Sequence, residues 1–325
     1  MYHRVIADSA DPWARHDPWA ICVSAAAFAE QMAVLAQAQA AIELGEFAAA
    51  DPHTRSGGRL AVTFDDGYLD NLITALPILE RHGIPATVFV VGNGVGRGRE
   101  FWWDALDRAI MAPAELPETL EFDFGDSART FTIVEQPGDA ELLRGWRAEG
   151  APRTVRQRLF RELWDAIVVL APSAQDAAVD HLLDWAGQPV AAPALRGPVD
   201  AEQFAALAEH PLITLGSHTL DHLSLTDLSP SAQRRQIHDG HRRVEELAGT
   251  RIDRFSYPFG RLDSGARAAV ADLDVSVACT SRPTAVTRGD DRMALPRLQA
   301  TEMDGEQFAR WLREEHALRL EHPGR

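Results

Sequence analysis

A unit of strand, helix and strand between residues 59 and 91 constrains the fold of this chain more than any other feature. The apolar runs at 59–64 and 86–91 predict two buried strands, and residues 69–82 between them predict a helix. Pro77 lies inside the helical segment, so a kink is expected there. Two strands joined through a helix run parallel, which is typical of an α/β sheet.

The alternation of strands and helices stops after residue 91 and resumes near residue 200. The glycine-rich segment at 92–99 lacks the spacing of a dinucleotide-binding loop. We interpret residues 97–198 as an inserted, mostly helical α+β subdomain or lid within one domain that spans residues 1–325. The other expected elements are helices at 26–44, 99–111, 153–170, 174–186, 200–208, 229–248, 264–271 and 304–320, a hairpin at 120–133, and strands at 212–215, 255–257, 275–279 and 295–298.

Two adjacent carboxylates, Asp65 and Asp66, end the first of these strands, and Gly67 follows at once. Neighbouring residues on a strand point to opposite faces, but a turn can rotate both acids into one cleft. Two carboxylates held close together are costly unless a cation lies between them or one keeps its proton. An Asp-Asp-Gly turn is also ordinary loop chemistry. From this motif alone, a turn and a functional site are equally good interpretations.

A histidine pair, His218 and His222, follows the expected strand at 212–215. Two histidines four residues apart fall on one side of a helical turn, where both can reach one metal ion. A pair of surface or capping histidines would give the same pattern. The position at a strand's carboxyl end favours a site, because these ends gather on one face of a parallel sheet. With a divalent cation there, the second carboxylate could act as a base toward water.

A third motif, Phe255-Ser256-Tyr257-Pro258-Phe259-Gly260, follows another expected strand end. Its last four residues, Tyr257, Pro258, Phe259 and Gly260, would fix a turn that exposes a flat apolar wall. Such a wall suits a sugar ring or an acyl methyl group. A packed aromatic turn without a ligand is the better interpretation of this motif when it is taken alone.

Charge and composition narrow the possible partners and reactions. The 325-residue chain has a formal net charge of −16, which argues against nucleic acid and anionic membranes, since both need a basic footprint. All 32 basic residues are arginine, so no lysine Schiff base is available. Cys22 and Cys279 match no zinc-finger spacing. No run has the length of a membrane span and no signal peptide is recognisable, which predicts a cytoplasmic protein. The chain begins inside its first expected strand, so an upstream segment is compatible with the sequence.

Taken together and in this order, the three motifs resemble those of the polysaccharide deacetylases, the NodB-homology family or carbohydrate esterase family 4. The resemblance covers residues 59–91 and 200–300, and Tyr2–Val5 is similar to the opening strand of many members. Phe101–Asp104 resembles members linked to bacterial surface-polysaccharide pathways. The resemblance implies a distorted (β/α) barrel with fewer than eight strands and a single deacetylase catalytic domain.

The resemblance also implies roles for individual residues. Asp65 would be the catalytic base, and Asp66, His218 and His222 would bind a divalent metal, most often zinc in this family. The reaction would be the hydrolytic removal of an N-acetyl or other short acyl group from an amino sugar. The partner would therefore be a saccharide or a sugar precursor, and Trp103 in the insertion could line its cleft, although paired tryptophans are more often core residues.

The sequence departs from the family pattern at two places. Ser256 occupies a position where many members have an arginine, and the late segment Leu295–Leu298 lacks the histidine that supplies the general acid. Arg297 could orient Asp65, because a guanidinium pairs well with a carboxylate, or it could be an ordinary exposed arginine. His3 is a candidate for the general acid, and a core or surface role is an equally good interpretation.

Other functions remain open from the residues alone. The same ligand set fits an O-deacetylase, a deformylase or a cyclic-amide hydrolase. Two histidines and one carboxylate also suit a non-haem Fe(II) oxygenase, but the adjacent second acid favours hydrolysis. A glycan-binding module without catalysis is a more distant alternative, against which the intact acids and histidines argue.

Overall fold

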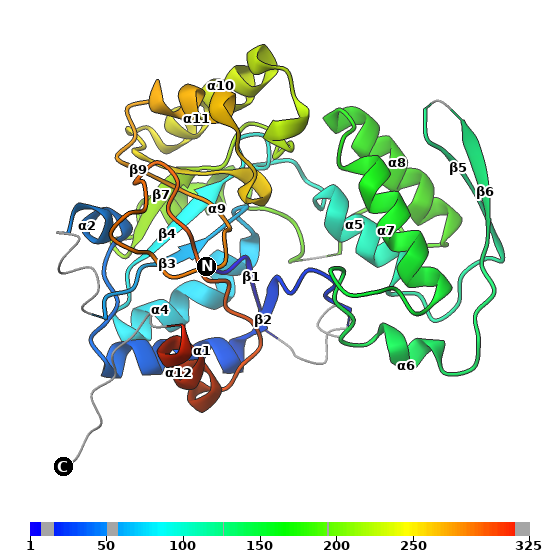
Figure 1. The fold of residues 1–325 in the computed structure, drawn as a ribbon, viewed down its shortest axis with the longest axis horizontal. Helices are drawn as coiled ribbons and strands as arrows, with labels where there is room; N and C mark the ends of the chain where they lie inside the picture. Colours follow the sequence, from blue (N-terminus) through cyan, green and yellow to red (C-terminus); the bar gives the residue numbers. More distant parts are fainter. Residues whose placement is uncertain (8–15, 51–57, 126, 194, 316–325) are drawn as a thin grey trace. The chain divides into compact units, whose positions relative to one another are not determined.

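The computed structural model describes residues 1–7, 16–50, 58–125, 127–193 and 195–315, which form two compact units. The first unit comprises Met1–Ala7, Cys22–Arg97 and Pro198–Arg325, and the second comprises Asp8–Ile21 and Gly98–Gly197. The segment expected as an insertion thus falls in the second unit (Figure 1). Its role as a lid stays a prediction.

A five-stranded sheet, parallel throughout, forms the centre of the first unit. Its strand order is β3-β4-β7-β8-β9, and every neighbouring pair runs parallel. This confirms the expected α/β fold with fewer than eight strands. The strands are β3 (Val62–Phe64), β4 (Ala86–Val90), β7 (Ile213–Ser217), β8 (Arg254–Ser256) and β9 (Val277–Cys279).

The sheet curls into a barrel whose gap is closed by irregular chain rather than by further strands. At one edge, Tyr2 bridges Phe64 of β3, with the Tyr2 N–H donating to the Thr63 carbonyl at 2.8 Å. At the other edge, Leu295 bridges Cys279 of β9. The two closing segments meet where the Ala300 N–H donates to the Met1 carbonyl at 3.0 Å.

The strand expected at 295–298 is therefore wrong in its length. Only Leu295 pairs with β9, donating to the Ala278 carbonyl and accepting from the Thr280 N–H. Pro296 follows and has no N–H to continue a ladder. The next N–H, from Arg297, donates instead to the Arg282 carbonyl at 3.1 Å.

The helix expected at 26–44 is two helices, α1 (Ala25–Gln37) and α2 (Leu44–Ala49). Between them, Gln39 adopts a left-handed φ of 49°, which ends the helical path. The chain then reaches the sheet edge, where Ala41 bridges Leu60. The Ser24 hydroxyl accepts from the Ala27 N–H and caps α1 directly after the short strand β2 (Cys22–Ser24), which pairs with β1 (Arg4–Ile6).

The helix expected at 69–82 begins as a π-helix, η2 (Asn71–Ala75), and continues as α4 (Leu76–His82). Pro77 lies in the first turn of α4, where its missing N–H is tolerated, and the wider turns precede it. The expected irregularity at Pro77 is thus a change of helix type. Gly83, with φ 63°, ends α4.

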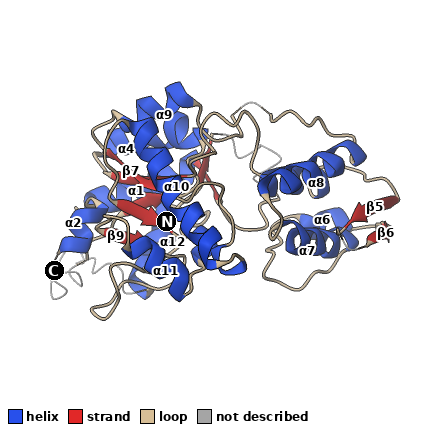
Figure 2. Ribbon diagram, turned by 90° about the horizontal axis from the view of Figure 1, so that it is seen from above, coloured by secondary structure: helices blue, strands red, loops and turns tan. Residues whose placement is uncertain are grey.

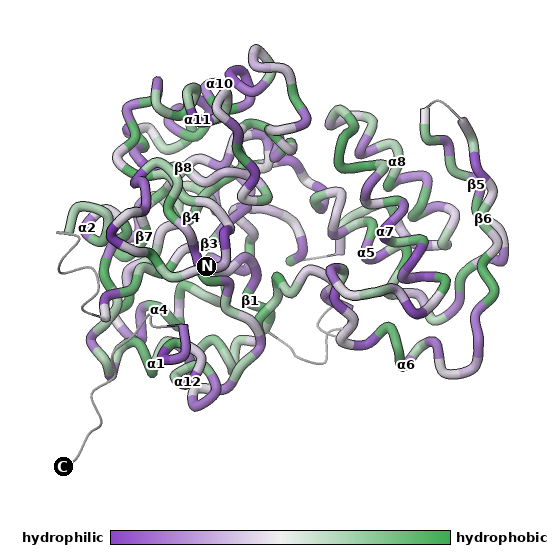
Figure 3. Tube along the Cα trace, viewed as in Figure 1, coloured by the Kyte–Doolittle hydropathy of each residue, from purple (hydrophilic) through white to green (hydrophobic). Residues whose placement is uncertain are grey.

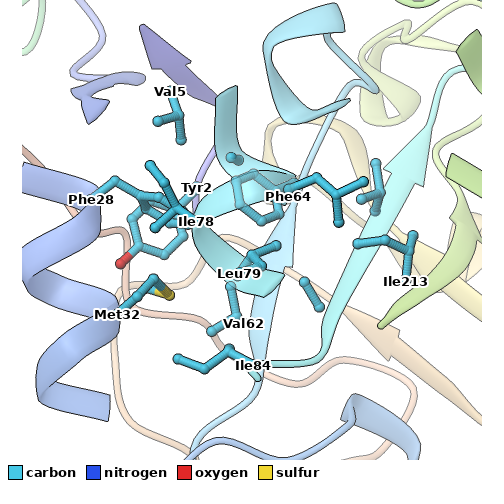
Figure 4. Packing of buried hydrophobic residues seen from close by; sticks show 14 of the residues in the cluster. Tyr2, Val5, Phe28, Met32, Val62, Phe64, Ile78, Leu79, Ile84 and Ile213 are labelled. Atoms are coloured by element: carbon cyan, nitrogen blue, oxygen red, sulfur yellow. The ribbon is translucent and has the colours of Figure 1, made fainter. Parts of the chain in front are cut away.

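The main core of the first unit lies between the sheet and the helices α1 and α4 (Figure 4). Tyr2, Phe28 and Phe64 pack ring on ring, with centroids 5.1 to 5.8 Å apart, and Met32 and Leu79 fill the space around them. Burying side chains of this size stabilises a fold by roughly 1.5–3 kcal/mol each. The core therefore fixes β3 and the chain around Tyr2 against each other.

Further helices complete the first unit. Hydrophobic and hydrophilic residues alternate along its helices, as expected of elements with one buried face (Figure 3). Among the described residues, none of the helices is both long and apolar enough to cross a membrane. Residues 316–320 of the expected last helix lie outside the described residues. The remaining elements are α9 (Ala201–Ala208), η3 (Leu225–Asp227), α10 (Pro230–Ala248), η4 (Pro258–Gly260), α11 (Ser264–Ala271) and α12 (Gly305–Glu314).

The described part of the second unit is mostly helical and includes an antiparallel hairpin (Figure 2). Trp185 of α8 donates its indole N–H to the Thr119 carbonyl at 2.7 Å, which fastens the hairpin to the helices. Arg156 of α7 is fully buried and donates to the Pro113 and Ala114 carbonyls at 2.5 and 3.1 Å. The elements are α5 (Trp102–Ile110), β5 (Thr119–Asp123), β6 (Ala128–Thr132), α6 (Asp139–Leu143), α7 (Val155–Ile167) and α8 (Pro172–Trp185).

Helix α10 approaches the chain after β7 so closely that only glycine fits at the contact. A Cβ atom on Gly240 would lie 2.2 Å from the backbone carbon of Thr219 and 2.3 Å from the nitrogen of Leu220. These are main-chain atoms, so a rotamer change cannot relieve the clash. We expect Gly240→Ala to lower the free energy of unfolding by about 1–3 kcal/mol in urea denaturation.

Helix propensity alone would give the opposite sign, since alanine is favoured over glycine by about 1 kcal/mol in a helix interior. Gly305→Ala in α12 is the matched control, because a Cβ there meets nothing nearer than 3.4 Å. This control should be neutral or slightly stabilised. A Gly240→Ala protein as stable as the wild type would contradict the close contact.

Candidate active site

The two adjacent acids turn into the barrel at the carboxyl end of β3. Asp65 and Asp66 are buried, with 2% and 3% of their surface exposed. Asp66 and Gly67 both have φ near 75°, so the chain rotates sharply after Asp65. A Cβ on Gly67 would press on Val90 at 3.1 Å in addition to the backbone strain. This turn brings both carboxylates to the same end of the sheet.

Asp66, His218 and His222 form a buried cluster that fits a divalent metal. One ligand atom from each residue lies within 4.8 Å of the others, and both histidine Nε2 atoms face Asp66 Oδ1, at 3.5 and 3.4 Å. Burial lowers the pKa of both imidazoles, which keeps them in the neutral form that binds metals. Two nitrogens and one oxygen suit zinc with positions left open for water or substrate.

The orientation of His218 is fixed from behind. Its Nδ1 lies 2.7 Å from the Ser256 carbonyl on β8, so this nitrogen carries the proton and donates to that oxygen. The tautomer leaves Nε2 free of hydrogen and directed at Asp66. Backbone carbonyls commonly orient metal-binding histidines in this way.

Backbone strain is concentrated at this cluster. Asp66, Thr219, His222 and Phe259 are non-glycine residues with φ between 56° and 75°. Each such residue costs of order 1–3 kcal/mol, and strain of this kind persists only where the surroundings enforce it. The Thr219 hydroxyl accepts from the His222 N–H at 3.1 Å and supports the strained loop. Four such residues from three loops indicate a functional site.

Asp65 faces a different partner from Asp66. Arg297 donates two hydrogen bonds to the Asp65 carboxylate, from Nη1 to Oδ1 at 2.7 Å and from Nη2 to Oδ2 at 2.6 Å. Arg297 is 8% exposed, so it is a buried residue rather than an exposed arginine. Burial alone would raise the pKa of Asp65, but the charge and hydrogen bonds of the Arg297 guanidinium outweigh it and hold this pKa well below its ordinary value. Asp65 is therefore ionised.

His3 lies beside the same acid. Its backbone carbonyl accepts from Asn71 Nδ2 at 2.8 Å, and its side-chain Nδ1 is buried without a hydrogen-bond partner among the residues that the structure describes. Burial lowers the pKa of His3 to about 4, while the charges of Asp65 and Arg297 act on it in opposite directions. The imidazole is thus neutral near pH 7 and within electrostatic range of Asp65.

Of the turn formed by Tyr257, Pro258, Phe259 and Gly260, only Phe259 is seen in contact with a residue of the metal cluster. Phe259 is partly exposed, and its ring meets His222 edge to face at 4.6 Å. Tyr257 and Pro258 are buried, and the Tyr257 hydroxyl donates to the Met293 carbonyl at 3.1 Å. Gly260 is partly exposed and packs where a Cβ would lie 2.5 Å from the Ser281 nitrogen.

Trp103 occupies a packed position in the second unit. Its ring stacks on Phe101 with a centroid distance of 4.6 Å and an interplanar angle of 8°. It is 6% exposed. A role for Trp103 in a saccharide cleft stays a prediction.

Ser256 is a site residue whose role the sequence did not reveal. Its hydroxyl accepts from Arg297 Nη2 at 2.8 Å and donates to Asp65 Oδ2 at 3.3 Å. The family pattern that the motifs resemble has an arginine at this position, whereas here Arg297 supplies the guanidinium from the closing segment. The small side chain of Ser256 leaves room for the Arg297 guanidinium. The serine in place of an arginine in the motif is the sequence signal that could have pointed to this role.

Comparison with known proteins identifies the family. The family model described as polysaccharide deacetylase matches residues 53–118 and 175–278, which make up just over half of the chain. The chain therefore belongs to the polysaccharide deacetylase family, whose members are enzymes that act on acetylated carbohydrates. A curated relative, YxkH of Bacillus subtilis (strain 168), whose name refers to polysaccharide deacetylases, is 20% identical over 252 residues. These cover 77% of this chain and 55% of YxkH, so the chain spans about half the length of that relative.

Solved structures with a similar fold cover nearly the whole chain. Streptococcus pyogenes deacetylase PplD, in complex with acetate, has a TM-score of 0.51 and 15% identity over 95% of both chains. IcaB from Ammonifex degensii has a TM-score of 0.51 and 18% identity over 95% of this chain and 94% of that chain. A de-N-acetylase from Aggregatibacter actinomycetemcomitans has a TM-score of 0.52 and 14% identity over 96% of this chain and 97% of that chain. At these identities the likeness shows the fold alone, and it agrees with the distorted barrel.

The cluster of Asp66, His218 and His222 predicts a defined metal stoichiometry. After loading with zinc and dialysis, the wild-type protein should hold about one metal ion per chain by elemental analysis. His218→Ala and Asp66→Ala should each lose most of this metal, since removing a ligand leaves two. His238→Ala is the control, because its imidazole contacts the Ala269 carbonyl on α11 instead. Stoichiometric zinc in His218→Ala would rule out this ligand set.

Proposed function

We propose that this chain is a metal-dependent N-deacetylase that hydrolyses the acetamido group of an amino sugar in a surface polysaccharide or its precursor. One observation carries the proposal: an ionised acid, Asp65, lies next to a three-residue metal cluster at the same strand end. Family membership supports deacetylation of carbohydrate. Zinc is the proposed ion, given two imidazoles and one carboxylate.

The reaction joins a water oxygen to the amide carbonyl carbon and breaks the bond from that carbon to nitrogen. An ion held by Asp66, His218 and His222 would supply Lewis acidity toward water and the carbonyl oxygen. Asp65 takes a proton from the attacking water, because its carboxylate is ionised and its other contacts hold it in place. Arg297 is a positioning residue, since it acts through Asp65 and fixes both carboxylate oxygens.

The leaving nitrogen needs a proton before it can depart as an amine. His3 is the proposed donor, because its imidazole lies within electrostatic range of Asp65 at the same end of the barrel. It is neutral in the free site, and the negative charge that develops on the carbonyl oxygen would raise its pKa. His3 is then protonated from solvent and gives that proton to nitrogen, while Asp65 later returns its proton to solvent.

Phe259 is the proposed apolar contact for the substrate. Its ring lies against His222, so a group bound to the open side of the metal cluster would meet an aromatic face. An acetyl methyl group or the apolar face of a sugar ring suits such a surface. Tyr257 and Pro258 would support this contact from the core rather than touch the substrate.

Asp65→Asn tests the base directly. The substitution keeps the shape of the side chain and removes its ability to accept a proton at neutral pH. We expect kcat for acetate release from an N-acetylated amino-sugar oligomer to fall by about 10²–10⁴-fold. Zinc content should stay near one ion per chain, because Asp65 is not in the ligand cluster. Full activity in Asp65→Asn would remove Asp65 from the role of base.

His3→Gln separates the acid from the base. Protonation matters for a poor leaving group such as an amine and little for a good one such as nitrophenolate. Acetate release from the N-acetylated sugar should fall by about 10²–10⁴-fold. Hydrolysis of 4-nitrophenyl acetate should change by no more than a few fold, whereas Asp65→Asn should impair both reactions. Equal losses of both activities in His3→Gln would contradict its role as the acid.

A further inference from the structure

The loop that carries both histidines is held on α10 and on the chain after β4. The Leu220 N–H donates to the backbone carbonyl of Gln236 at 2.9 Å, and Gly240 allows α10 to approach within contact of Thr219 and Leu220. From the other side, the Gly92 N–H donates to the Thr219 carbonyl at 3.0 Å and the Asn93 N–H to the Leu220 carbonyl at 2.8 Å. The loop is therefore fixed at successive peptide groups.

The residue just before His222 is clamped most completely. Gln236 Nε2 donates to Asp221 Oδ2 at 2.7 Å, and the Asp221 N–H donates back to Gln236 Oε1 at 2.9 Å. Asn93 Nδ2 donates to the other carboxylate oxygen, Oδ1, at 2.7 Å. The amide of Gln236 thus binds both the main chain and the side chain of Asp221. Asp221 is engaged in these bonds rather than directed at a ligand.

This clamp acts at the point where the loop is strained. Thr219 and His222, on either side of Asp221, both have left-handed φ angles that non-glycine residues avoid. Such angles persist only when neighbouring groups enforce them. Fixing the peptide of Asp221 at its N–H limits the rotation that would move His222 away from Asp66. Gln236 thereby orients the imidazole of His222 by holding Asp221, although Gln236 is not one of the metal-ligand residues.

We propose that Gln236 is a positioning residue, which sets the geometry of His222 through Asp221 and so tunes metal affinity and turnover. The proposal rests on the metal-dependent function proposed above. Gln236 is 9% exposed, and both ends of its amide are used in this reciprocal pair. A buried glutamine whose amide oxygen and amide nitrogen both bond to the same residue has a specific structural task.

The same helix supplies a matched control. Gln233 lies one turn earlier, is 1% exposed, and also makes two side-chain hydrogen bonds through its Nε2. Its partners are the Leu225 carbonyl and Asp263 Oδ2, both at 2.9 Å and both outside the loop from Ser217 to His222. Gln233→Ala should therefore lower thermal stability to a similar extent as Gln236→Ala without changing how the metal is held.

The first experiment measures zinc affinity by chelator competition in the full chain, together with kcat and KM for acetate release. Gln236→Ala should weaken zinc binding by about 10–100-fold. With saturating zinc, kcat should fall while KM changes by less than about threefold, as expected when a reacting geometry is disturbed. Cobalt-loaded protein should show an altered visible absorption spectrum in Gln236→Ala, because the ligand geometry changes. Gln233→Ala should match the wild type in all of these readouts.

An exchange of the two groups supplies the rescue. Gln236→Glu alone sets two carboxylates against each other, and Asp221→Asn alone sets its NH₂ group against that of Gln236 or that of Asn93, so each should weaken zinc binding. In the double variant the acid and the amide trade places. The introduced amide can donate to the introduced carboxylate and still accept from Asn93, and the N–H at position 221 keeps an acceptor. Zinc affinity and kcat should return to within about threefold of the wild type.

The outcomes separate this proposal from the function on which it rests. A wild-type protein that binds no zinc and releases no acetate would overturn the proposed function itself. If the wild type does both, and Gln236→Ala keeps its zinc affinity and kcat within twofold, the positioning role is wrong. A double variant as impaired as the worse single variant would likewise overturn the hydrogen-bonded pair as the cause.

Discussion

The buried pair of Asp65 and Arg297 is the interaction on which the rest of the site depends. Two charges removed from water are costly unless every donor and acceptor is satisfied. Here all five N–H groups of Arg297 are used: Nε donates to the Thr280 carbonyl, and the two terminal nitrogens donate to Thr63, Asp65 and Ser256. A lysine could not reproduce this planar set of contacts. The pair thus fixes the Asp65 carboxylate and also joins β3, β8 and the segment that closes the barrel.

Around this pair, strained backbone conformations lie in the loops that carry the site residues, and rigid strands and a helix hold these loops. The left-handed residues Asp66, His222 and Phe259 belong to three different loops, each following a strand of one parallel sheet. Hydrogen bonds within the loops support these conformations, as where the Thr219 hydroxyl accepts from the His222 N–H. Strands position the loops and helix α10 braces one of them, so precision comes from rigid elements rather than from the loops alone.

Much of this architecture could be predicted from the sequence because it is local. Hydrophobic periodicity predicts the unit of strand, helix and strand at 59–91. Gly67, directly after Asp65 and Asp66, predicts the turn at the end of the first strand. The motifs also predicted the family. By contrast, residues 295–298 were expected to form a strand, and only the tertiary contacts show that the pairing ends at Pro296, after one residue. The burial of Tyr257 depends on packing from distant helices, which no local pattern encodes.

The barrel seam has a consequence for how the protein is made. Asp65 and Arg297 are 232 residues apart in the chain, and the residues between them include Gly98–Gly197, the larger part of the second unit. During synthesis, β3 and its acid emerge from the ribosome long before their cationic partner does. A buried carboxylate without that partner favours its protonated form. The Asp65 carboxylate is therefore stabilised in its ionised form only after residue 297 has been added and the segment that carries Arg297 has closed the barrel.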